Sequence, residues 1–535
     1  MNNPMIETPQ TSTVRLRWGL AGLLLISLTA AAYAEPTRSQ ISSAKVNFAV
    51  QDVQQLCQEA VDDETVPGIA VAVVFHDRVV YARGFGVRDV ETRQPVDADT
   101  VFQLASVSKP ISSTIVAALI GGGKISWDSK ITELDPSFAM YDPWVTREIT
   151  IRDFFAHRSG LPDHSGDLLE DLGFTRPMIL HRLRYQRPDS SFRSQYAYTN
   201  FGITEAAVAA AKAYGLTWEE ASDQKLFEPL GMRSTSSRYA DFVARSNKAL
   251  GHVQENGKWV QKYKRDPDAE APAGGVSSSV NDLAKWVRLE LAGGKFNGEQ
   301  LVDAEALSIA YSPQILTGFS PVDGLPGFYG LGWNVGYDRE GRLRLGHSGA
   351  FALGAATNVL LIPPEQLGIV VLTNAYPIGF AEGIANTFAD VALYGKSTQD
   401  WFAIFKKAFS NPAVIGVTVG PDYSKSPDSL SPALPNSTYV GRYSNDFFGE
   451  IEVIETANGL AIVEGPEKRT FPLAHFDRDT FTYETEGENA VGVTGVTFTI
   501  GSNRKAASVV VENLDARGEG IFKPVTEDTA RKGSD

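Results

Sequence analysis

Ser106-Val-Ser-Lys109 opens an apolar stretch that continues as Pro110-Ile-Ser-Ser-Thr-Ile-Val-Ala-Ala-Leu-Ile120 and ends at Gly121-Gly-Gly123. Together with the preceding Val101-Phe-Gln-Leu-Ala, this pattern predicts an apolar helix that has Ser106 in its first turn. Pro110 fits such a first turn, where the missing N–H of proline would have no intrahelical partner. The positive end of the helix dipole would then favour negative charge at Ser106.

The spacing of Ser106 and Lys109 suits nucleophilic catalysis. A lysine one helical turn away can take the proton of the hydroxyl, provided that burial or nearby positive charge keeps its amine neutral. The same Ser-x-x-Lys pattern occurs at Ser42 to Lys45 and at Ser502 to Lys505, where we expect no buried helix to begin. The sequence therefore favours Ser106 as the nucleophile.

Two further motifs follow in order along the chain, and they strengthen this interpretation. Tyr198-Thr-Asn200 lies at an expected transition from loop to helix, and His347-Ser-Gly349 lies at the end of an expected strand. A second Tyr-x-Asn, Tyr443-Ser-Asn445, falls in what we expect to be a separate C-terminal domain. A structural role for Tyr198 is the alternative. The three motifs together predict an acyl-transfer site.

These motifs resemble those of the serine β-lactamase and penicillin-binding-protein superfamily, in its class C-like branch. The similar segments include Phe155-Ala-His157-Arg-Ser-Gly-Leu-Pro162, Ala273-Gly-Gly-Val-Ser-Ser-Ser-Val-Asn-Asp282 and Tyr329-Gly-Leu-Gly-Trp333. The resemblance covers about residues 45 to 400. It implies an α/β (α+β) fold in which helices flank an antiparallel sheet and a helical insertion splits it.

The resemblance also implies a role for each residue of the motifs. Ser106 would be the nucleophile, Lys109 its proton acceptor and Tyr198 the group that passes the proton to the leaving group. The substrate would be bound by Asn200, by the strand that carries His347 and Gly349, and by an oxyanion hole made of the backbone N–H groups of Ser106 and Ala350. Whether Lys109 or Tyr198 takes the first proton stays open.

One motif departs from the pattern of β-lactamases, which carry Lys-Thr-Gly where this chain has His347-Ser-Gly349. A histidine with an ordinary pKa of about 6.5 is mostly neutral at pH 7 and holds a carboxylate less firmly than lysine does. We therefore expect weak or absent β-lactamase activity and favour an aminopeptidase, amidase or esterase. Retention of Asn200 favours peptide or amide substrates, because the esterase branch often lacks this residue. D-amino-acid substrates are one option, and D or L configuration stays open.

Three alternative interpretations stay open at this point. Gly346-His-Ser348-Gly-Ala350 nearly matches the nucleophile elbow of α/β-hydrolases, but the following residues 351–362 predict a hairpin rather than a helix, and His475 is the only histidine further on. A carboxylesterase with the same fold is the second alternative. The third is a non-catalytic penicillin-recognising sensor or cell-wall binding protein, which the intact Ser106, Lys109 and Tyr198 argue against.

The N-terminal residues 1–34 predict a secretory signal peptide. Arg15 and Arg17 precede an apolar run that ends in Ala32-Tyr-Ala34, which is typical of a cleavage site. The run is shorter than the roughly 20 residues that span a bilayer, so an uncleaved anchor is disfavoured. We expect an exported protein, periplasmic or extracellular, with a hydrolase domain at 35–400, a helix and linker at 401–437 and a barrel domain at 438–535.

Short alternating runs in the tail predict a small antiparallel β-barrel, in which Asn458-Gly459 marks a hairpin turn. The tail resembles the lipocalin-like domains that are appended to some hydrolases of this superfamily. Such a barrel could cover the mouth of the active site, bind a ligand or mediate a homo-oligomer. Elsewhere, residues 68–75 and 78–83 predict a hairpin, and residues 343–347, 356–362 and 367–373 predict strands.

Composition narrows the classes of partner. The 49 basic and 64 acidic residues give a net charge of −15, which disfavours nucleic acid and anionic membranes as partners. The single cysteine, Cys57, excludes an intrachain disulfide, and the seven histidines include no His-Glu-x-x-His. We assign His157 a structural role rather than a zinc site shared with His164. The sequence thus predicts no metal or cofactor, and a small-molecule or peptide substrate.

Overall fold

The computed structural model describes residues 41–411, 421–425, 427 and 429–525. The predicted signal peptide, residues 1–34, and residues 412–420 of the predicted linker lie outside the described residues. Within these residues, no helix has the length and apolar character needed to cross a membrane.

An eight-stranded antiparallel sheet forms the centre of the larger part of the chain. In spatial order its strands are β2 (Arg78–Gly86), β1 (Gly68–Phe75), β14 (Leu367–Thr373), β13 (Ala355–Ile362), β12 (Leu343–Phe351), β11 (Asn334–Tyr337), β10 (Pro326–Tyr329) and β9 (Ile315–Phe319). The sequence predicted the hairpin of β1 and β2 and the three strands β12 to β14, all of which are confirmed. Because β9 to β11 are short, their alternation was too weak to predict.

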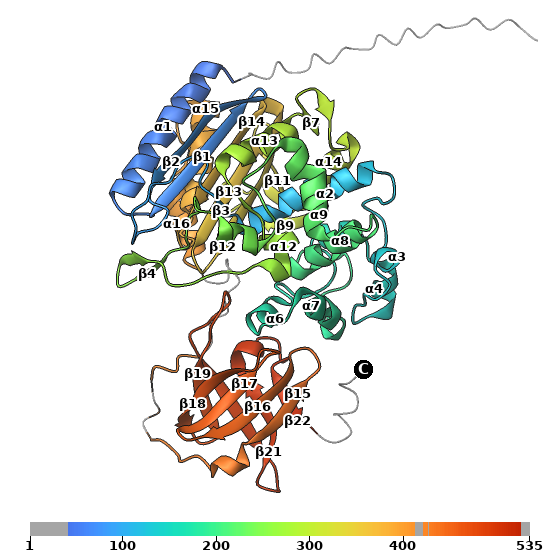
Figure 1. The fold of residues 1–535 in the computed structure, drawn as a ribbon, viewed down its shortest axis with the longest axis vertical. Helices are drawn as coiled ribbons and strands as arrows, with labels where there is room; N and C mark the ends of the chain where they lie inside the picture. The colour runs from blue at the N-terminus through green and yellow to red at the C-terminus, as the bar shows by residue number, and fades with distance from the viewer. Residues whose placement is uncertain (1–40, 412–420, 426, 428, 526–535) are drawn as a thin grey trace, which may run out of the picture. The chain divides into compact units, whose positions relative to one another are not determined.

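Helices cover both faces of this sheet (Figure 1). Every residue of β1 is buried, since Ile69 and Val71 pack with α1 (Ser43–Asp62) and α15 (Phe380–Tyr394), whereas Ala70 and Ala72 face the core of α2 (Ser108–Gly121) and α13 (Val280–Leu291). Alternating side chains on a strand reach opposite faces, so one strand feeds two cores. Cys57 lies buried in α1.

A helical insertion occupies much of the chain between β2 and β9. Its helices are α3 (Ile131–Leu134), α4 (Pro143–Glu148), α5 (Ile151–Phe155), α6 (Asp167–Asp171), α7 (Arg176–Arg182), α8 (Asn200–Lys212), α9 (Trp218–Ser222), α10 (Glu228–Leu230), α11 (Tyr239–Ala244), α12 (Ala271–Gly274) and α14 (Ala304–Ala310). Two-stranded pairs accompany them: β3 (Phe102–Gln103) with β6 (Ser277–Ser278), β4 (Val253–Glu255) with β5 (Lys258–Val260), and β7 (Lys295–Phe296) with β8 (Glu299–Gln300). The fold class predicted from the sequence is confirmed.

The tail forms a closed eight-stranded barrel, as predicted. Its strands are β15 (Gly441–Asn445), β16 (Gly449–Thr456), β17 (Gly459–Glu464), β18 (Arg469–Asp477), β19 (Thr480–Glu484), β20 (Val493–Ile500), β21 (Ala506–Val511) and β22 (Ile521–Pro524). The expected turn at Asn458 joins β16 to β17. Before the barrel lies the predicted helix α16 (Trp401–Phe409), which Asp400 caps.

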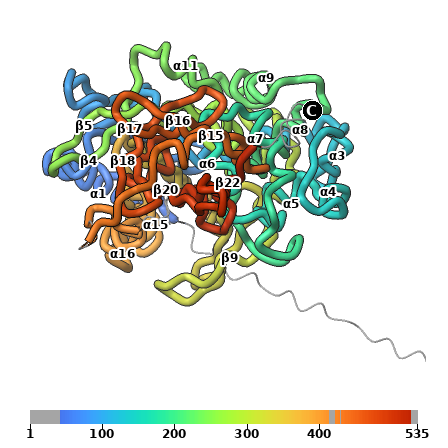
Figure 2. Tube along the Cα trace, turned by 90° about the horizontal axis from the view of Figure 1, so that it is seen from below, coloured from blue at the N-terminus to red at the C-terminus, as the bar shows by residue number. Residues whose placement is uncertain are grey.

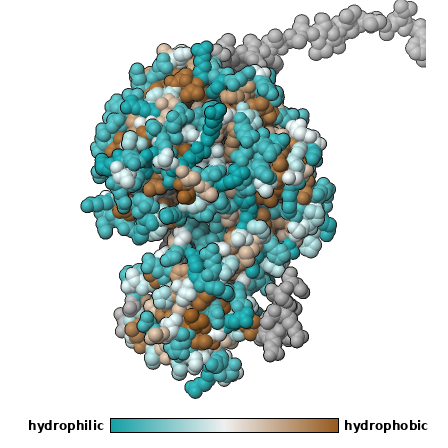
Figure 3. Space-filling view, in the orientation of Figure 1, coloured by the Kyte–Doolittle hydropathy of each residue, from teal (hydrophilic) through white to brown (hydrophobic). Residues whose placement is uncertain are grey.

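The barrel contacts the helical insertion. Figures 1 and 2 both place α6 and α7 beside it. Arg182 of α7 donates hydrogen bonds to the carbonyl oxygens of Asp446 and Phe447, and Gln186 pairs with Glu519. The outer face drawn in Figure 3 is mostly hydrophilic, with apolar residues in scattered patches. The main apolar clusters therefore lie in the interior.

One predicted element differs from the structure. Residues 101–106 were expected to belong to the helix, but Phe102 and Gln103 form β3, and a single 3₁₀ turn, Ala105–Val107, precedes α2. The reason is local, because Ala105 has a φ of 48°, a left-handed conformation that a right-handed helix cannot contain. β3 instead pairs with β6, which satisfies its backbone.

Strand β12 passes very close to this 3₁₀ turn. A Cβ added to Gly349 would lie 2.1 Å from the carbonyl oxygen of Leu104 and 2.3 Å from Oγ1 of Thr357. Those two oxygens are joined by a buried hydrogen bond of 2.6 Å. Gly349 is thus required by the approach of two main chains, and it sets the distance between β12 and Ser106.

We predict that Gly349→Ala lowers the free energy of unfolding by about 2 kcal/mol, because the methyl group overfills this contact and separates Thr357 from Leu104. Denaturant unfolding of both proteins measures the change. Gly336→Ala on neighbouring β11 is the control, since no atom lies within 4 Å of its added Cβ and its stability should stay close to that of the parent. Equal stability of the two variants would contradict the prediction.

Candidate active site

Ser106 lies in the 3₁₀ turn before α2, so its backbone N–H is near the positive end of that helix. Its Oγ accepts a hydrogen bond of 2.9 Å from Nζ of Lys109 and one of 2.7 Å from the phenol of Tyr198. The first two sequence motifs therefore meet at one oxygen. A hydroxyl between an amine and a phenol can exchange its proton with either.

The Lys109 side chain is fully buried, with 0% of its surface exposed. Its Nζ also donates to Oδ1 of Asn200 (2.6 Å) and to the carbonyl oxygen of Ala273 (3.1 Å). Burial lowers the pKa of Lys109 to about 7, although the carboxylates of Glu270 and Asp167 act in the opposite direction. Desolvation, rather than neighbouring positive charge, is thus the main reason that this amine can be neutral.

Tyr198 is held by its backbone and by neighbouring rings tilted against its own. Its N–H donates to Oδ1 of Asp163 (2.7 Å), its carbonyl accepts from the N–H of His164 (2.7 Å), and its ring lies 4.5 Å from that of His157. Burial raises the pKa of the Tyr198 phenol well above 10. His157 is buried and its Nδ1 accepts from the N–H of Thr199, which fits the structural role expected of it.

Asn200 bridges two groups of the site. Its Oδ1 accepts from Lys109, while its Nδ2 donates to Oδ2 of Asp167 (2.9 Å). An amide nitrogen carries two N–H groups, so one remains for a substrate. Asp167 was not singled out from the sequence, although it holds Asn200 in place and also accepts from Nδ1 of His164 (2.8 Å).

His347 lies on β12, the predicted strand, with 5% of its surface exposed. Its Nε2 meets the phenol of Tyr329 at 2.9 Å, and its Nδ1 meets the carbonyl oxygen of Ser348 at 2.6 Å. Burial and the charge of Lys109 lower the pKa of His347 to about 3. The ring is therefore neutral at physiological pH, and both of its nitrogens are already engaged.

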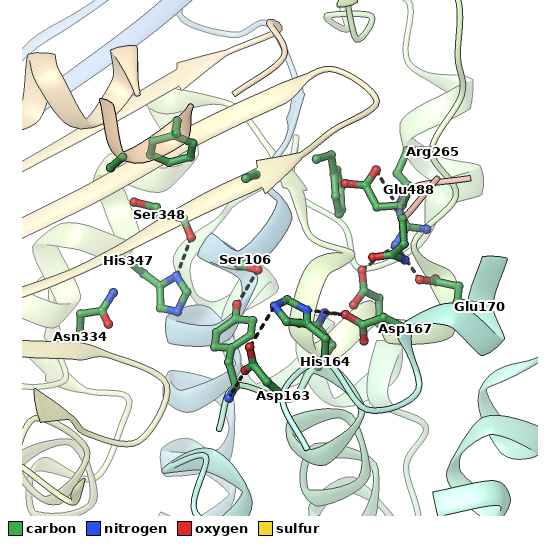
Figure 4. Close-up of a pocket in the computed structure, with 18 of the residues that line it drawn as sticks. Ser106, Asp163, His164, Asp167, Glu170, Arg265, Asn334, His347, Ser348 and Glu488 are labelled. Atoms are coloured by element: carbon green, nitrogen blue, oxygen red, sulfur yellow. Dashed lines mark hydrogen bonds and ion pairs between the residues drawn. The ribbon is translucent and has the colours of Figure 1, made fainter. Parts of the chain in front are cut away.

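A cavity of about 440 Å³ opens above Ser106. It is lined by the predicted residues Tyr198, Asn200, His347 and Ala350. In Figure 4, His347, Ser348 and Asn334 lie on one side of Ser106, and Arg265, Glu170 and Glu488 lie on the other. Gly349 does not line the cavity but lies beneath its wall, against Ser106, where an added Cβ would be 3.1 Å from the Ser106 nitrogen.

Ser348, the rival nucleophile, has a different setting. It lies within β12, which continues to Phe351 and turns into β13 rather than into a helix. Its Oγ accepts from Nδ2 of Asn358 at 3.2 Å, and His475 lies in the barrel on β18. Of the other Ser-x-x-Lys matches, Ser42 caps helix α1, but residues 42–45 are exposed there.

Several lining residues carry charge and had no recognisable motif. They are Asp163, His164, Asp167, Glu170, Arg265, Glu270 and Glu488. Only the spacing of Asp167 and Glu170 on α6 could have hinted at a common face. A further wall consists of Phe405, Ala408 and Phe409 of α16, a helix that was predicted but not connected to the site.

The comparisons with known proteins agree with this geometry. The Beta-lactamase family profile matches residues 53–393, and a domain of unknown function, DUF3471, matches residues 425–523. The solved structure of the octameric penicillin-binding protein homologue from Pyrococcus abyssi is similar to this chain, with a TM-score of 0.57 and 22% sequence identity. The match covers 86% of this chain and 98% of that chain. That likeness concerns the fold.

Curated relatives share about a quarter of their residues with this chain over most of their own length. The unguisins hydrolase ungD of Aspergillus violaceofuscus is 25% identical over 76% of this chain and 77% of its own. The beta-lactamase of Escherichia coli is 27% identical over 59% and 86%, and the D-alanyl-D-alanine-carboxypeptidase/endopeptidase AmpH of the same species is 23% identical over 67% and 91%. With the family profile spanning most of its larger part, this chain belongs to the β-lactamase family of hydrolases.

Proposed function

We propose that this chain is an exported serine hydrolase that cleaves a peptide, amide or ester bond through an acyl-enzyme on Ser106. The supporting observation is the placement of Lys109 Nζ and Tyr198 OH at 2.9 and 2.7 Å from Ser106 Oγ. Ser106 would attack the carbonyl carbon of the substrate, and water would later release the acyl group. The backbone N–H groups of Ser106 and Ala350 would hold the oxyanion.

The pKa values of Lys109 and Tyr198 differ, and the difference indicates which group takes the first proton. Burial lowers the pKa of Lys109 to about 7 and raises that of Tyr198 well above 10, so the neutral amine and the protonated phenol coexist near neutral pH. A neutral amine can donate to Asn200 and Ala273 while its lone pair faces Ser106. We therefore assign the first proton to Lys109, and Tyr198 donates to the leaving group.

We also propose that β-lactams are poor substrates. The carboxylate of a β-lactam needs a cation near the strand that carries His347. This imidazole has a pKa lowered to about 3, and its nitrogens face Tyr329 and the Ser348 carbonyl. A neutral ring with no free N–H provides little attraction for an anion. The retained Asn200 favours amide or peptide substrates over esters.

We propose the cellular location and the classes of partner from the sequence. Residues 1–34 have the features of a secretory signal, so we propose a periplasmic or extracellular location. The net charge of −15 argues against nucleic-acid and anionic-membrane partners. A homo-oligomer built through the barrel also remains a proposal, which sedimentation of the purified protein would test.

Ser106→Ala is predicted to lower turnover at least about a thousandfold while leaving the fold unchanged. The substrates are D-alanine p-nitroanilide, its L counterpart, a short-chain nitrophenyl ester and a chromogenic cephalosporin. Ser502→Ala, in the exposed Ser-x-x-Lys, is the control and should match the parent. Turnover of the ester alone would favour the carboxylesterase, and inactivity toward all four substrates would favour the non-catalytic sensor.

Full activity of Ser106→Ala would overturn the assignment of Ser106 as the nucleophile. Loss of activity in Ser348→Ala would then indicate Ser348 as the nucleophile instead.

We predict that kcat/KM rises with pH across neutrality, because only the deprotonated Lys109 amine can accept the Ser106 proton. Glu270→Gln removes a negative charge that raises the pKa of Lys109, so the midpoint of the rise should move to lower pH. Glu59→Gln, on the exposed face of α1, should leave the midpoint in place. A pH profile that is flat or falls between pH 6 and 8 would argue against Lys109 as the base.

A further inference from the structure

A second cavity, of about 430 Å³, lies beside the catalytic one. Helix α11 lines one part of it, and the hairpin that joins β12 to β13 lines another. None of the side chains that meet at Ser106 Oγ lines it, so its role does not depend on the proposed function. Its volume falls in the range of cavities that bind small organic molecules.

Arg265 and Phe351 line both cavities and form the partition between them. The central carbon of the Arg265 guanidinium lies 4.9 Å from the centre of the Phe351 ring, and the two residues are only 8% and 4% exposed. Nη2 of Arg265 also pairs with Glu170 (2.6 Å) and Glu270 (2.7 Å). Because the partition is buried and held by these contacts, a molecule in the second cavity is separate from one that meets Ser106.

Aromatic rings line this second cavity from three segments of the chain. Tyr239 and Phe242 lie on α11, with ring centres 6.1 Å apart and planes 28° from parallel. Tyr263 adds a third ring, and Phe351 adds the ring of the partition. Aromatic groups that pack together are stabilised beyond the effect of their buried area, so the cavity favours an aromatic ligand.

The charged residues that line the second cavity within the described part of the chain are all basic: Lys248, Lys264 and Arg265. Arg265 is balanced by its two glutamates. Nζ of Lys248 donates to the carbonyl oxygens of Val243 (2.9 Å) and Arg245 (2.8 Å), which are uncharged and leave its positive charge unbalanced. The wall therefore attracts an anion, although the whole chain has a net charge of −15.

Two donors at this wall are available to bind such an anion. The amine of Lys264 makes no hydrogen bond or ion pair with any residue that the structure describes, and neither does the phenol of Tyr239. Burial and the nearby Asp266 and Asp268 raise the pKa of this phenol, so it stays protonated and can donate. Both aspartates are exposed, and neither lines the cavity.

We propose that the second cavity binds an aromatic carboxylate, as a ligand separate from the substrate, with its carboxylate at Lys264 and Tyr239. The rings of Phe242 and Phe351 cover the apolar part of the ligand, and the amine and the phenol supply charge-assisted hydrogen bonds to its anionic end. A cation of the same shape is repelled by the lysines, and a neutral analogue lacks the attraction.

Calorimetry on the full-length protein tests the class of ligand with two probes of nearly equal shape, 2-naphthylacetate and the uncharged 2-naphthylacetamide. We expect the carboxylate to bind about tenfold more tightly than the amide, as for one partly exposed ion pair and one hydrogen bond. This preference should fall as the salt concentration rises. Equal binding of the two probes, or binding of neither, would overturn the proposal.

Three variants test the place of binding. Lys264→Gln should reduce the preference for the carboxylate about fivefold, and Lys258→Gln, exposed on β5 outside the cavity, is the control with the same change of net charge. Val243→Trp should weaken binding of both probes, because Val243 is 48% exposed where it lines the cavity and a larger side chain would fill the space. Equal behaviour of the two lysine variants, or unchanged binding in Val243→Trp, would exclude this cavity as the site.

Competition separates this site from the catalytic cavity. With any substrate that the protein turns over, 2-naphthylacetate should either leave the rate unchanged or inhibit without raising KM alone, since the partition keeps the two molecules apart. Purely competitive inhibition would place the probe beside Ser106 and overturn the proposal. Inactivity toward every substrate, with binding of 2-naphthylacetate that depends on Lys264, would contradict the proposed function and leave the second site supported.

Discussion

Burial of the Lys109 amine beside Ser106 is the constraint on which the rest of this site depends. Removing an ammonium from water is unfavourable, so burial lowers the pKa of Lys109. The oxygens of Asn200 and Ala273 accept hydrogen bonds from the buried amine. The arrangement needs α2, α8 and α12 to converge at a single nitrogen. It also needs Gly349, because a larger residue would push β12 away from the turn that holds Ser106.

The carboxylates near Lys109 and the burial of its amine have opposite effects on the pKa of Lys109. Glu270 and Asp167 raise the pKa of the amine, while burial lowers it, and the result is a group that changes charge near neutrality. If these carboxylates were absent, the amine would be neutral over a wider pH range but would lose the bridge through Asn200 to Asp167. The acidic side of the cavity therefore influences the charge state of the Lys109 amine.

The sequence predicted much of the fold, and it singled out the residues that meet at Ser106 Oγ, because both have local signatures. Ser106 and Lys109 are one helical turn apart, β12 to β14 are continuous apolar runs, and Asn458 with Gly459 marks a hairpin. The start of this helix was predicted too early because the sequence does not indicate that Ala105 has a left-handed backbone conformation. Glu488 and Arg265 could not be predicted as site residues, since they come from segments far apart in the chain and meet only when the barrel docks.

That docking attaches the barrel to strand β12. Glu488 accepts hydrogen bonds from Ala352 and Leu353, which follow β12 directly, and the same strand carries Ala350, whose N–H we propose for the oxyanion hole. The backbone N–H of Glu488 donates to the carboxylate of Asp171 on α6, while the Glu488 carboxylate accepts from Ala352 at the end of β12. The loop between β19 and β20 is therefore attached both to the helical insertion and to the strand beside Ser106. The barrel thereby forms part of the wall of the cavity that contains Ser106.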